Sequence, residues 1–346
     1  MLILTRESIR EEDAMKSIGR RRFVNGCAAL SAAAFMPASF GQQLRKINFI
    51  TPFGYLIGYA PTLNAQAGGH FAKEGLDVTV LPGKGSAVAV QQVIAGRALY
   101  GRGDPLAATK AIAEGAPIIS FATVEHRSPI VVYSSPAKPI RNVKDMVGKT
   151  IGIAAKGSAS DNILDMMLAM AGLPLDAAHR EAVGNSPGGW GLIQQGRIDA
   201  HIVSIGTTTT LRESGEKIVM WNTSDAVAMP GQAYFALRET VKKDADVLLK
   251  ALRAERASIL ELKKADGRAM VERMSRLWEI EGARQVDFTV VAMRDEEHLW
   301  WHDDTRKLLK NDPASWRSMI GAMLKAGLLK SGSPDQFYTD EIIAKL

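Results

Sequence analysis

Cysteine is nearly absent from this sequence. The chain has 346 residues and one cysteine, Cys27, which lies in an uncharged stretch near the N-terminus. The part beyond residue 41 therefore has no thiol for a disulfide framework, a nucleophile or a zinc–cysteine site. P-loop and HExxH patterns are also missing, and GRGDPL at Gly101–Leu106 lacks the third glycine of a dinucleotide-binding loop. We predict no catalytic residue, no bound metal and no cofactor.

A concentrated basic surface is also missing. The net charge is +6, and after the first 41 residues 37 Lys and Arg stand against 33 Asp and Glu, which leaves +4 spread along the chain. No basic stripe interleaved with aromatic residues occurs, so a nucleic-acid partner is not expected. With 46% hydrophobic and 23% charged residues, the chain can bury a large core. About 305 residues remain for one or two folded domains once the N-terminal region is set aside.

An N-terminal targeting signal is the first positive feature. In the run SIGRRRFVN, Arg20, Arg21 and Phe23 match the R-R-x-F pattern of twin-arginine export. The uncharged stretch Gly26–Phe40 follows directly, and its fifteen residues are too few to span a bilayer. We expect residues 1–41 to form a signal peptide and the rest of the chain to reach the periplasm by the twin-arginine route.

A strand–loop–helix unit occurs twice. Lys149–Ala154 reads as a buried strand, small residues follow, and apolar residues at helical spacing begin near Ser160 and end at Gly172. KINFI at Lys46–Ile50 resembles KTIGI at Lys149–Ile153. In the same way, VIAGRALYGRGD at Val93–Asp104 resembles IQQGRIDAHIVS at Ile193–Ser204, again about one hundred residues later. We therefore predict two similar α/β units, over roughly Lys46–Leu106 and Lys149–Ile205.

These units define the predicted architecture, an α/β fold with two doubly wound lobes joined by two hinge strands. Val131–Val132 and Tyr234–Leu237 are predicted to carry the chain out of the first lobe and back into it. Lobe 1 is then discontinuous, with residues 42–132 and 233–346, and lobe 2 comprises residues 133–232. Further helices are predicted at Pro61–Ala72, Ser86–Ala95, Pro105–Gly115, Met270–Ile280 and Leu308–Leu328.

Three motifs carry a resemblance to a known family. GHFAKEGLDV at Gly69–Val78, VKDMVGKTIGIAAKGS at Val143–Ser158 and QQGRIDA at Gln194–Ala200 resemble segments of the nitrate, sulfonate, taurine and thiamine-pyrimidine-precursor solute-binding proteins of bacterial ABC importers. The resemblance implies a periplasmic binding protein type II-like fold, a cleft that closes on one small molecule, and delivery to a permease with its ATPase. The chain departs from the family's Gly-x-hydrophobic-Asp pattern at Gly96–Leu99, and it has polar residues at Ser204–Thr210 where many relatives have a proline.

Candidate binding residues follow from the rule that ligands of open parallel sheets lie beyond the carboxyl ends of the strands. Serine hydroxyls near helix N-termini can bind an acceptor-rich solute. Arg102 can clamp a sulfonate or carboxylate through two donors, or it can pair with Asp104, which can itself cap a helix. Tyr55, Tyr59 and Trp190 can stack on a planar ligand or simply pack. The candidate set is Thr51, Tyr55, Ser86, Arg102, Asp104, Gly157, Ser158, Ser160, Trp190 and Ser204.

Two features of the sequence could indicate an enzyme, and neither is favoured. His298 and His302 lie four residues apart in EEHLWWHDD and could share a helix face as metal ligands, but a helix end or a packing edge suits this charged run better. A pyrimidine synthase of the same fold would carry a cysteine-rich motif, which the chain lacks beyond residue 41. We expect a monomeric solute-binding protein without enzymatic activity. Its predicted solute is a small organic anion such as an alkanesulfonate or taurine, and the alternative is a thiamine pyrimidine precursor.

Overall fold

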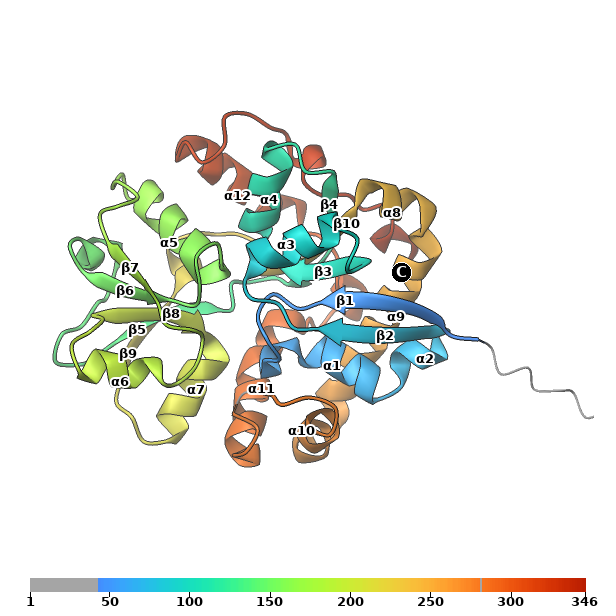
Figure 1. The fold of residues 1–346 in the computed structure, drawn as a ribbon, viewed down its shortest axis with the longest axis horizontal. Helices are drawn as coiled ribbons and strands as arrows, with labels where there is room; N and C mark the ends of the chain where they lie inside the picture. The colour runs from blue at the N-terminus through green and yellow to red at the C-terminus, as the bar shows by residue number, and fades with distance from the viewer. Residues whose placement is uncertain (1–42, 281) are drawn as a thin grey trace, which may run out of the picture. The chain divides into compact units, whose positions relative to one another are not determined.

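The computed structural model describes residues 43–280 and 282–346, and it contains two five-stranded sheets (Figure 1). The first sheet has the order β2 (Leu76–Leu81), β1 (Arg45–Ile50), β3 (Tyr100–Gly103), β10 (Gln232–Leu237), β4 (Ile118–Glu125). The second has the order β7 (His179–Ala182), β6 (Thr150–Ile153), β8 (Ala200–Ser204), β5 (Ile130–Ser134), β9 (Val219–Asn222). Residues predicted to form the signal peptide lie outside the described part.

The two sheets share one topology. In the first, β1 pairs in parallel with β2 and β3, and β10 runs antiparallel between β3 and β4. In the second, β6 pairs in parallel with β7 and β8, and β5 runs antiparallel between β8 and β9. The matching order agrees with the predicted repetition of one α/β unit.

Helices cover both faces of each sheet. Successive residues of a strand point to opposite faces, and here they enter different apolar clusters. Phe49 packs with one cluster and Ile50 with another, and in the second sheet Val131 and Val132 are divided in the same way. The helices of lobes 1 and 2 up to β10 are α1 (Ala60–Ala67), α2 (His70–Lys73), α3 (Ser86–Ile94), α4 (Pro105–Ala113), α5 (Ala159–Met170), α6 (Gly189–Gln194) and α7 (Ile205–Glu213). The predicted doubly wound α/β fold is thereby confirmed.

Local sequence explains where several helices begin and end. Asp104 caps α4 by accepting a hydrogen bond from the Leu106 N–H, and Pro105 occupies the first turn, where a missing N–H does no harm. The predicted helix Pro61–Ala72 is divided in two at Gly68–Gly69, and Gly69 has a φ of 71°, in the left-handed region that glycine enters without strain.

The chain passes between the sheets twice. It leaves the first sheet after Glu125 and enters the second at Ile130, and it returns between Asn222 and Gln232. Strand β5 pairs only within the second sheet, so the pairing places it in lobe 2, whereas the predicted boundary after residue 132 divides it. We propose that residues 126–129 and 223–231 are the hinges between the lobes.

The C-terminal region is helical, but its elements differ from the prediction. It contains α8 (Arg238–Lys243), α9 (Ala245–Lys264), α10 (Gly267–Ser275), α11 (Val286–Trp300) and α12 (Pro313–Lys325). Helix α11 was not predicted. The predicted start of the last helix at Leu308 is wrong, because Asp312 caps the helix and Pro313 stands in its first turn.

Short 3₁₀ turns complete the described chain, at Ile57–Tyr59 (η1), Val143–Met146 (η2), Thr223–Asp225 (η3), Thr305–Lys307 (η4), Pro334–Gln336 (η5) and Ile343–Lys345 (η6). In the part of the chain that the structure describes, no helix is both long and apolar enough to cross a bilayer.

Candidate functional site

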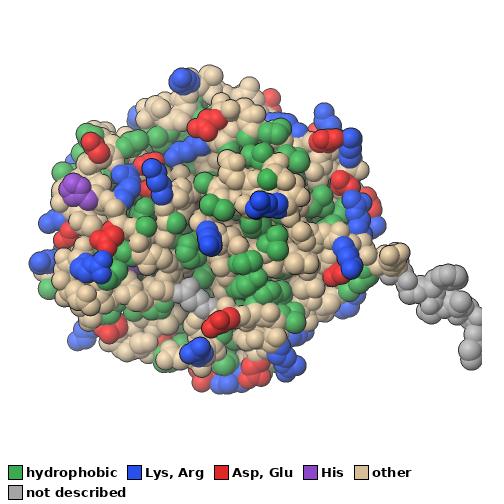
Figure 2. Space-filling model, in the orientation of Figure 1, with side chains coloured by type: hydrophobic (Ala, Val, Ile, Leu, Met, Phe, Trp, Pro, Cys, Tyr) green, Lys and Arg blue, Asp and Glu red, His purple; other side chains and the backbone are tan. Residues whose placement is uncertain are grey.

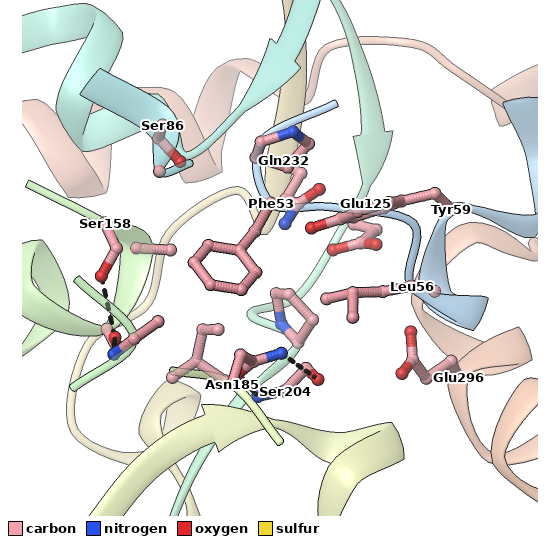
Figure 3. Close-up of a pocket in the computed structure, with 18 residues that line it drawn as sticks. Phe53, Leu56, Tyr59, Ser86, Glu125, Ser158, Asn185, Ser204, Gln232 and Glu296 are labelled. Carbon is pink, nitrogen blue, oxygen red and sulfur yellow. Dashed lines mark hydrogen bonds between the residues drawn. The ribbon is translucent and has the colours of Figure 1, made fainter. Parts of the chain in front are cut away.

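A small cavity lies between the lobes, at the sheet edges where the parallel strands end. Its free volume is about 50 Å³, which is room for several water molecules. Loops after β1, β2, β6 and β7 line it, together with the ends of β4 and β8 and the start of β10. Polar or aromatic side chains along its wall are Phe53, Tyr59, Ser86, Glu125, Ser158, Ser160, Asn185, Ser204, Gln232 and Glu296 (Figure 3).

One wall of the cavity consists of hydroxyls at helix N-termini. Ser158 caps α5, and its Oγ lies 2.9 Å from that of Ser160, which accepts the Ala154 N–H at 2.8 Å. Ser86 begins α3, and its Oγ accepts the Asp104 N–H at 3.1 Å. The positive ends of these two helices favour an acceptor-rich or anionic group at this wall.

The lobes touch beside this wall. The Ala87 N–H donates to the Gly157 carbonyl at 3.2 Å, which joins the first turn of α3 to the loop before α5. A Cβ on Gly157, whose φ is 72°, would come within 3.0 Å of the Ala87 Cβ. Asn162 of α5 also donates to the Asp104 carboxylate at 3.0 Å. The cavity is therefore closed at this side by direct contacts between lobes.

A second pair of contacts fixes the start of α7. Asn185 donates to the Ser204 Oγ at 3.1 Å, while the Ser204 N–H donates to the Asn185 Oδ1 at 3.0 Å. Thr207 adds a hydrogen bond from its hydroxyl to the Asn185 carbonyl at 2.9 Å. Ser204 and Asn185 thus hold each other at the cavity wall.

Two buried glutamates line the opposite wall. Glu125 ends β4, and one of its carboxylate oxygens accepts a hydrogen bond from the Arg102 guanidinium. Arg102 is fully buried, donates also to Gln232 and to the Gly58 carbonyl, and lies 4.8 Å above the ring of Tyr59. The other carboxylate oxygen of Glu125, Oε2, is buried and has no hydrogen-bond partner among the described residues.

Glu296 reaches the same wall from α11. Its Oε1 accepts the Gly206 N–H at 3.0 Å, in the first turn of α7. A Cβ on Gly58 would lie 2.0 Å from the Glu296 Oε2, and one on Gly206 would lie 2.3 Å from its Oε1. Glycine at both positions is therefore what allows this carboxyl group between the two lobes.

Burial dominates the electrostatics of these groups. It raises the pKa of Glu296 to about 8, an effect that the neighbouring Glu125 carboxylate reinforces and Arg102 opposes. Burial likewise raises the pKa of Glu125 to about 7, although Arg102 favours its charged form. The pKa of Tyr59 rises well above its usual value because the phenol is buried.

Four of the ten predicted residues line the cavity, namely Ser86, Ser158, Ser160 and Ser204. Gly157 lies next to this wall and contacts Ala87. Arg102 and Asp104 are buried behind the wall and do not pair with each other, since Arg102 binds Glu125 and Asp104 caps α4.

The three remaining predicted residues serve the protein's own packing. Thr51 is buried, and its hydroxyl donates to the Gly54 carbonyl at 2.6 Å. Tyr55 donates to the Val80 carbonyl at 3.1 Å and packs against Trp278. Trp190 is buried in an apolar cluster with Tyr133. None of the three lines the cavity.

Three residues that line the cavity were not among the predicted binding residues, namely Glu125, Gln232 and Glu296. Glu125 directly follows the apolar run Ile118–Val124, which the sequence pattern predicts as a strand, so the rule of strand ends could have found it. Gln232 starts an antiparallel strand, and Glu296 lies on an unpredicted helix. For these two residues the sequence holds no local signal.

The structure gives no support to catalytic readings of the histidines. Both nitrogens of His201 are engaged, with the Tyr133 hydroxyl and the Gly184 carbonyl. The expectation that the chain has no G-x-S-x-G motif is wrong, because GNSPG at Gly184–Gly188 has this spacing of a nucleophile elbow. His298 and His302 each contact nearby backbone through Nδ1. Among residues 43–280 and 282–346, no group of three or more His, Cys, Asp or Glu is placed to hold a metal ion.

Comparison with known structures identifies the fold as that of periplasmic binding proteins. A protein of Bordetella bronchiseptica RB50 matches with a TM-score of 0.72 at 20% identity, over 88% of this chain and 97% of its own. The periplasmic nitrate-binding protein NrtA of Synechocystis PCC 6803 matches at 0.67 with 13% identity, over 88% of each chain. The alkanesulfonate-binding protein SsuA of Xanthomonas axonopodis pv. citri, bound to MOPS, matches at 0.62 with 14% identity, over 88% of this chain and 98% of its own.

The family follows from the sequence itself. The model of the family described as NMT1/THI5 like matches residues 57–266, more than half of the chain, and the chain belongs to this family. A search of curated protein sequences found no match to this chain. The family assignment confirms the resemblance drawn from the three motifs, while the low identities to the solved structures establish the fold alone.

Proposed function

We propose that this chain is the solute-binding component of an ABC importer and that it captures a small polar organic molecule in the cavity between its lobes. The cavity itself carries the proposal, because polar groups from strand ends of both lobes converge on it while only two segments connect the lobes. The chain would work by hinge closure around its solute, with the permease and its ATPase as partners.

The lining of the cavity indicates which chemical classes of solute it can bind. The N-termini of α3 and α5 suit a sulfonate or another acceptor-rich group, as expected for an alkanesulfonate or taurine. The aromatic ring of Phe53 lies between the two walls (Figure 3) and gives specific support to the second candidate, a planar pyrimidine precursor of thiamine.

We further infer binding without turnover. The lining contains no histidine, lysine or cysteine among the described residues, and the hydroxyls of Ser86, Ser158 and Ser160 accept backbone hydrogen bonds. Among the described residues, the recorded hydrogen-bond partners of these three hydroxyls are backbone N–H groups and one another, and no carboxylate or imidazole is positioned to activate them.

The proposed setting is the periplasm, reached through the twin-arginine signal at Arg20 and Arg21. The protein would act as a monomer. Basic side chains are scattered rather than gathered on the face shown in Figure 2, which fits a small-molecule partner better than a nucleic acid.

Thermal-shift screening of the exported part of the chain tests the proposal. A solute present at one hundred times its Kd should add about 2.7 kcal/mol of stability. We expect stabilisation by at least one member of a panel of alkanesulfonates, taurine, aromatic carboxylates and pyrimidines. Mass spectrometry of the bound compound should show it unchanged.

A matched pair of variants on α5 locates the site. Ala159→Phe places a ring in the cavity wall and should abolish the ligand-dependent shift, whereas Ala171→Phe, at the exposed end of the same helix, should keep it. Absence of a shift with every compound, or an equal shift in both variants, would contradict the proposal.

A further inference from the structure

We propose that the Glu125–Glu296 wall recognises a nitrogen-bearing cation, so that the solute carries a protonated amino group at this end. This inference rests on the proposed function, because it assigns a solute class to the same cavity. It divides the cavity into an acceptor-binding wall at Ser86 and Ser158 and a cation-binding wall at the two glutamates, which Figure 3 shows on opposite sides of Phe53.

The first argument is an unpartnered oxygen. Glu125 is 1% exposed and lines the cavity, yet its Oε2 has no hydrogen-bond partner among the described residues. A buried carboxylate oxygen without a donor is destabilising, because it has lost its hydration without gaining a hydrogen bond. A solute with N–H donors would satisfy it.

The second argument is charge. Glu125 and Glu296 line one cavity, are 1% and 2% exposed, and have Arg102 as the cation that acts on both. Arg102 binds Glu125, Gln232 and the Gly58 carbonyl through Nε and Nη2, whereas its Nη1 is buried without a partner among the described residues. Arg102 lies behind the wall, and no Lys or Arg is part of the described lining. The wall is therefore short of one positive charge when both carboxyl groups are ionised, and an ammonium group would supply it.

The surroundings of Glu296 reinforce this imbalance. Asp295, the preceding residue of α11, is acidic and pairs with Arg212 of α7, so that arginine is engaged away from the cavity. Tyr59 of η1 is a buried phenol, and its ring is covered by the Arg102 guanidinium. Neither neighbour offers a free positive charge to the wall.

Proton linkage distinguishes a cation from an anion at this wall. The pKa values of about 8 for Glu296 and about 7 for Glu125 mean that both carboxyl groups are partly protonated near neutral pH. A bound ammonium group lowers both pKa values and expels protons, so its affinity should rise between pH 6 and pH 8. An anion bound at the same wall would take up protons and bind more weakly as the pH rises.

Titration calorimetry with matched compounds tests the inference. The pairs are taurine with ethanesulfonate and β-alanine with propanoate, measured at pH 7 in two buffers of different ionisation enthalpy. We expect the amine of at least one pair to bind about tenfold more tightly than its partner and to release protons.

Variants then assign the effect to the wall. Glu296→Gln should weaken binding of that amine about tenfold, abolish most of the proton release and leave the amine-free partner unaffected. Glu297→Gln, on the same helix but outside the cavity, removes a carboxylate that pairs with Lys263 and Arg294, and it should bind as the wild type does. Glu125→Gln should also weaken binding of the amine, and thermal melting checks that this variant is folded.

Other outcomes of the calorimetry would overturn the inference. If the amine-free members bind as tightly as the amines, or binding takes up protons, the inference is overturned while the proposed function stands. If none of these four compounds binds, the inference is overturned, and the proposed function is judged separately by the wider thermal-shift panel.

Discussion

At the scale of single residues, Glu296 connects two properties of the protein. Its carboxyl group accepts a hydrogen bond at the N-terminus of α7, where an anionic ligand would be favoured, and it also lines the cavity. The helix end is thus already occupied by a group of the chain itself. This leaves the N-termini of α3 and α5 as the ends that a solute can reach.

The pH dependence of stability should report on Glu296. Its pKa lies near 4.5 in the unfolded chain and at about 8 in the folded protein, so the folded state holds a proton that the unfolded state has lost. Its contribution to stability is fully present below about pH 4.5 and is lost as the pH rises to about 8. Glu296→Gln stays neutral and should flatten the fall in unfolding free energy between pH 5 and pH 8.

Urea unfolding at pH 5, 6.5 and 8 measures this slope. Glu297→Gln is the control, because Glu297 is the next residue of the same helix and forms ion pairs with Lys263 and Arg294 instead of lining the cavity. Parallel slopes for Glu296→Gln and wild type would refute the assignment.

At the scale of elements, three helix pairs join the lobes, namely α4–α5, α12–α5 and α11–α7. On one side α4 meets α5, where Asn162 donates to Asp104 and accepts from Lys110 at 3.1 Å. On the other side α11 meets α7 through Glu296 and through Asp295, which binds Thr209 and Arg212. Apolar packing accompanies these polar contacts, because Leu106 of α4 and Trp316 of α12 belong to one buried cluster with Met167 of α5.

Asn162→Ala should weaken the closed arrangement. The substitution removes hydrogen bonds between the lobes and leaves the buried Asp104 with one partner fewer, which costs about 1–3 kcal/mol. Solute affinity should fall by about five- to one-hundred-fold, since only the closed form holds the solute. Calorimetry measures the affinity, and small-angle X-ray scattering should show a larger radius of gyration for the free variant.

A matched asparagine provides the comparison. Asn142 caps η2, and its hydrogen bonds join it to Lys144 and Asp145 within the same turn of lobe 2. Asn142→Ala should lower stability without changing solute affinity. An unchanged affinity in Asn162→Ala would mean that the α4–α5 contact does not contribute to closure.

At the scale of the whole molecule, the proposed export signal would determine the compartment in which the protein meets its solute. Replacing both Arg20 and Arg21 by lysine keeps the charge but removes the R-R pair that the twin-arginine route requires. We expect the double variant to remain inside the cell, as measured by fractionation and immunoblotting. The single variant Arg22→Lys, which leaves the pair intact, should be exported, and export of the double variant would exclude this route.

Much of the architecture could be predicted from the sequence alone. Strand and helix periods, glycine and proline positions and the repeated unit led to the doubly wound lobes, because these features depend on neighbours within a few residues. The serines predicted from strand ends lie beside the cavity for the same reason. Helix α11 was missed although its buried residues, among them Ala292, Met293 and Leu299, recur at helical spacing. Its packing against α7 and η1 is what the sequence does not show.

The sequence by itself therefore determined the two α/β units and the serine wall, because hydrophobic period and helix capping are local properties of the chain. Only the tertiary structure decided which residues form the opposite wall of the cavity. Glu125, Gln232 and Glu296 come from segments more than one hundred residues apart or from an unpredicted helix, and only folding brings them to one cavity. Burial there, rather than residue type, raises the carboxyl pKa values.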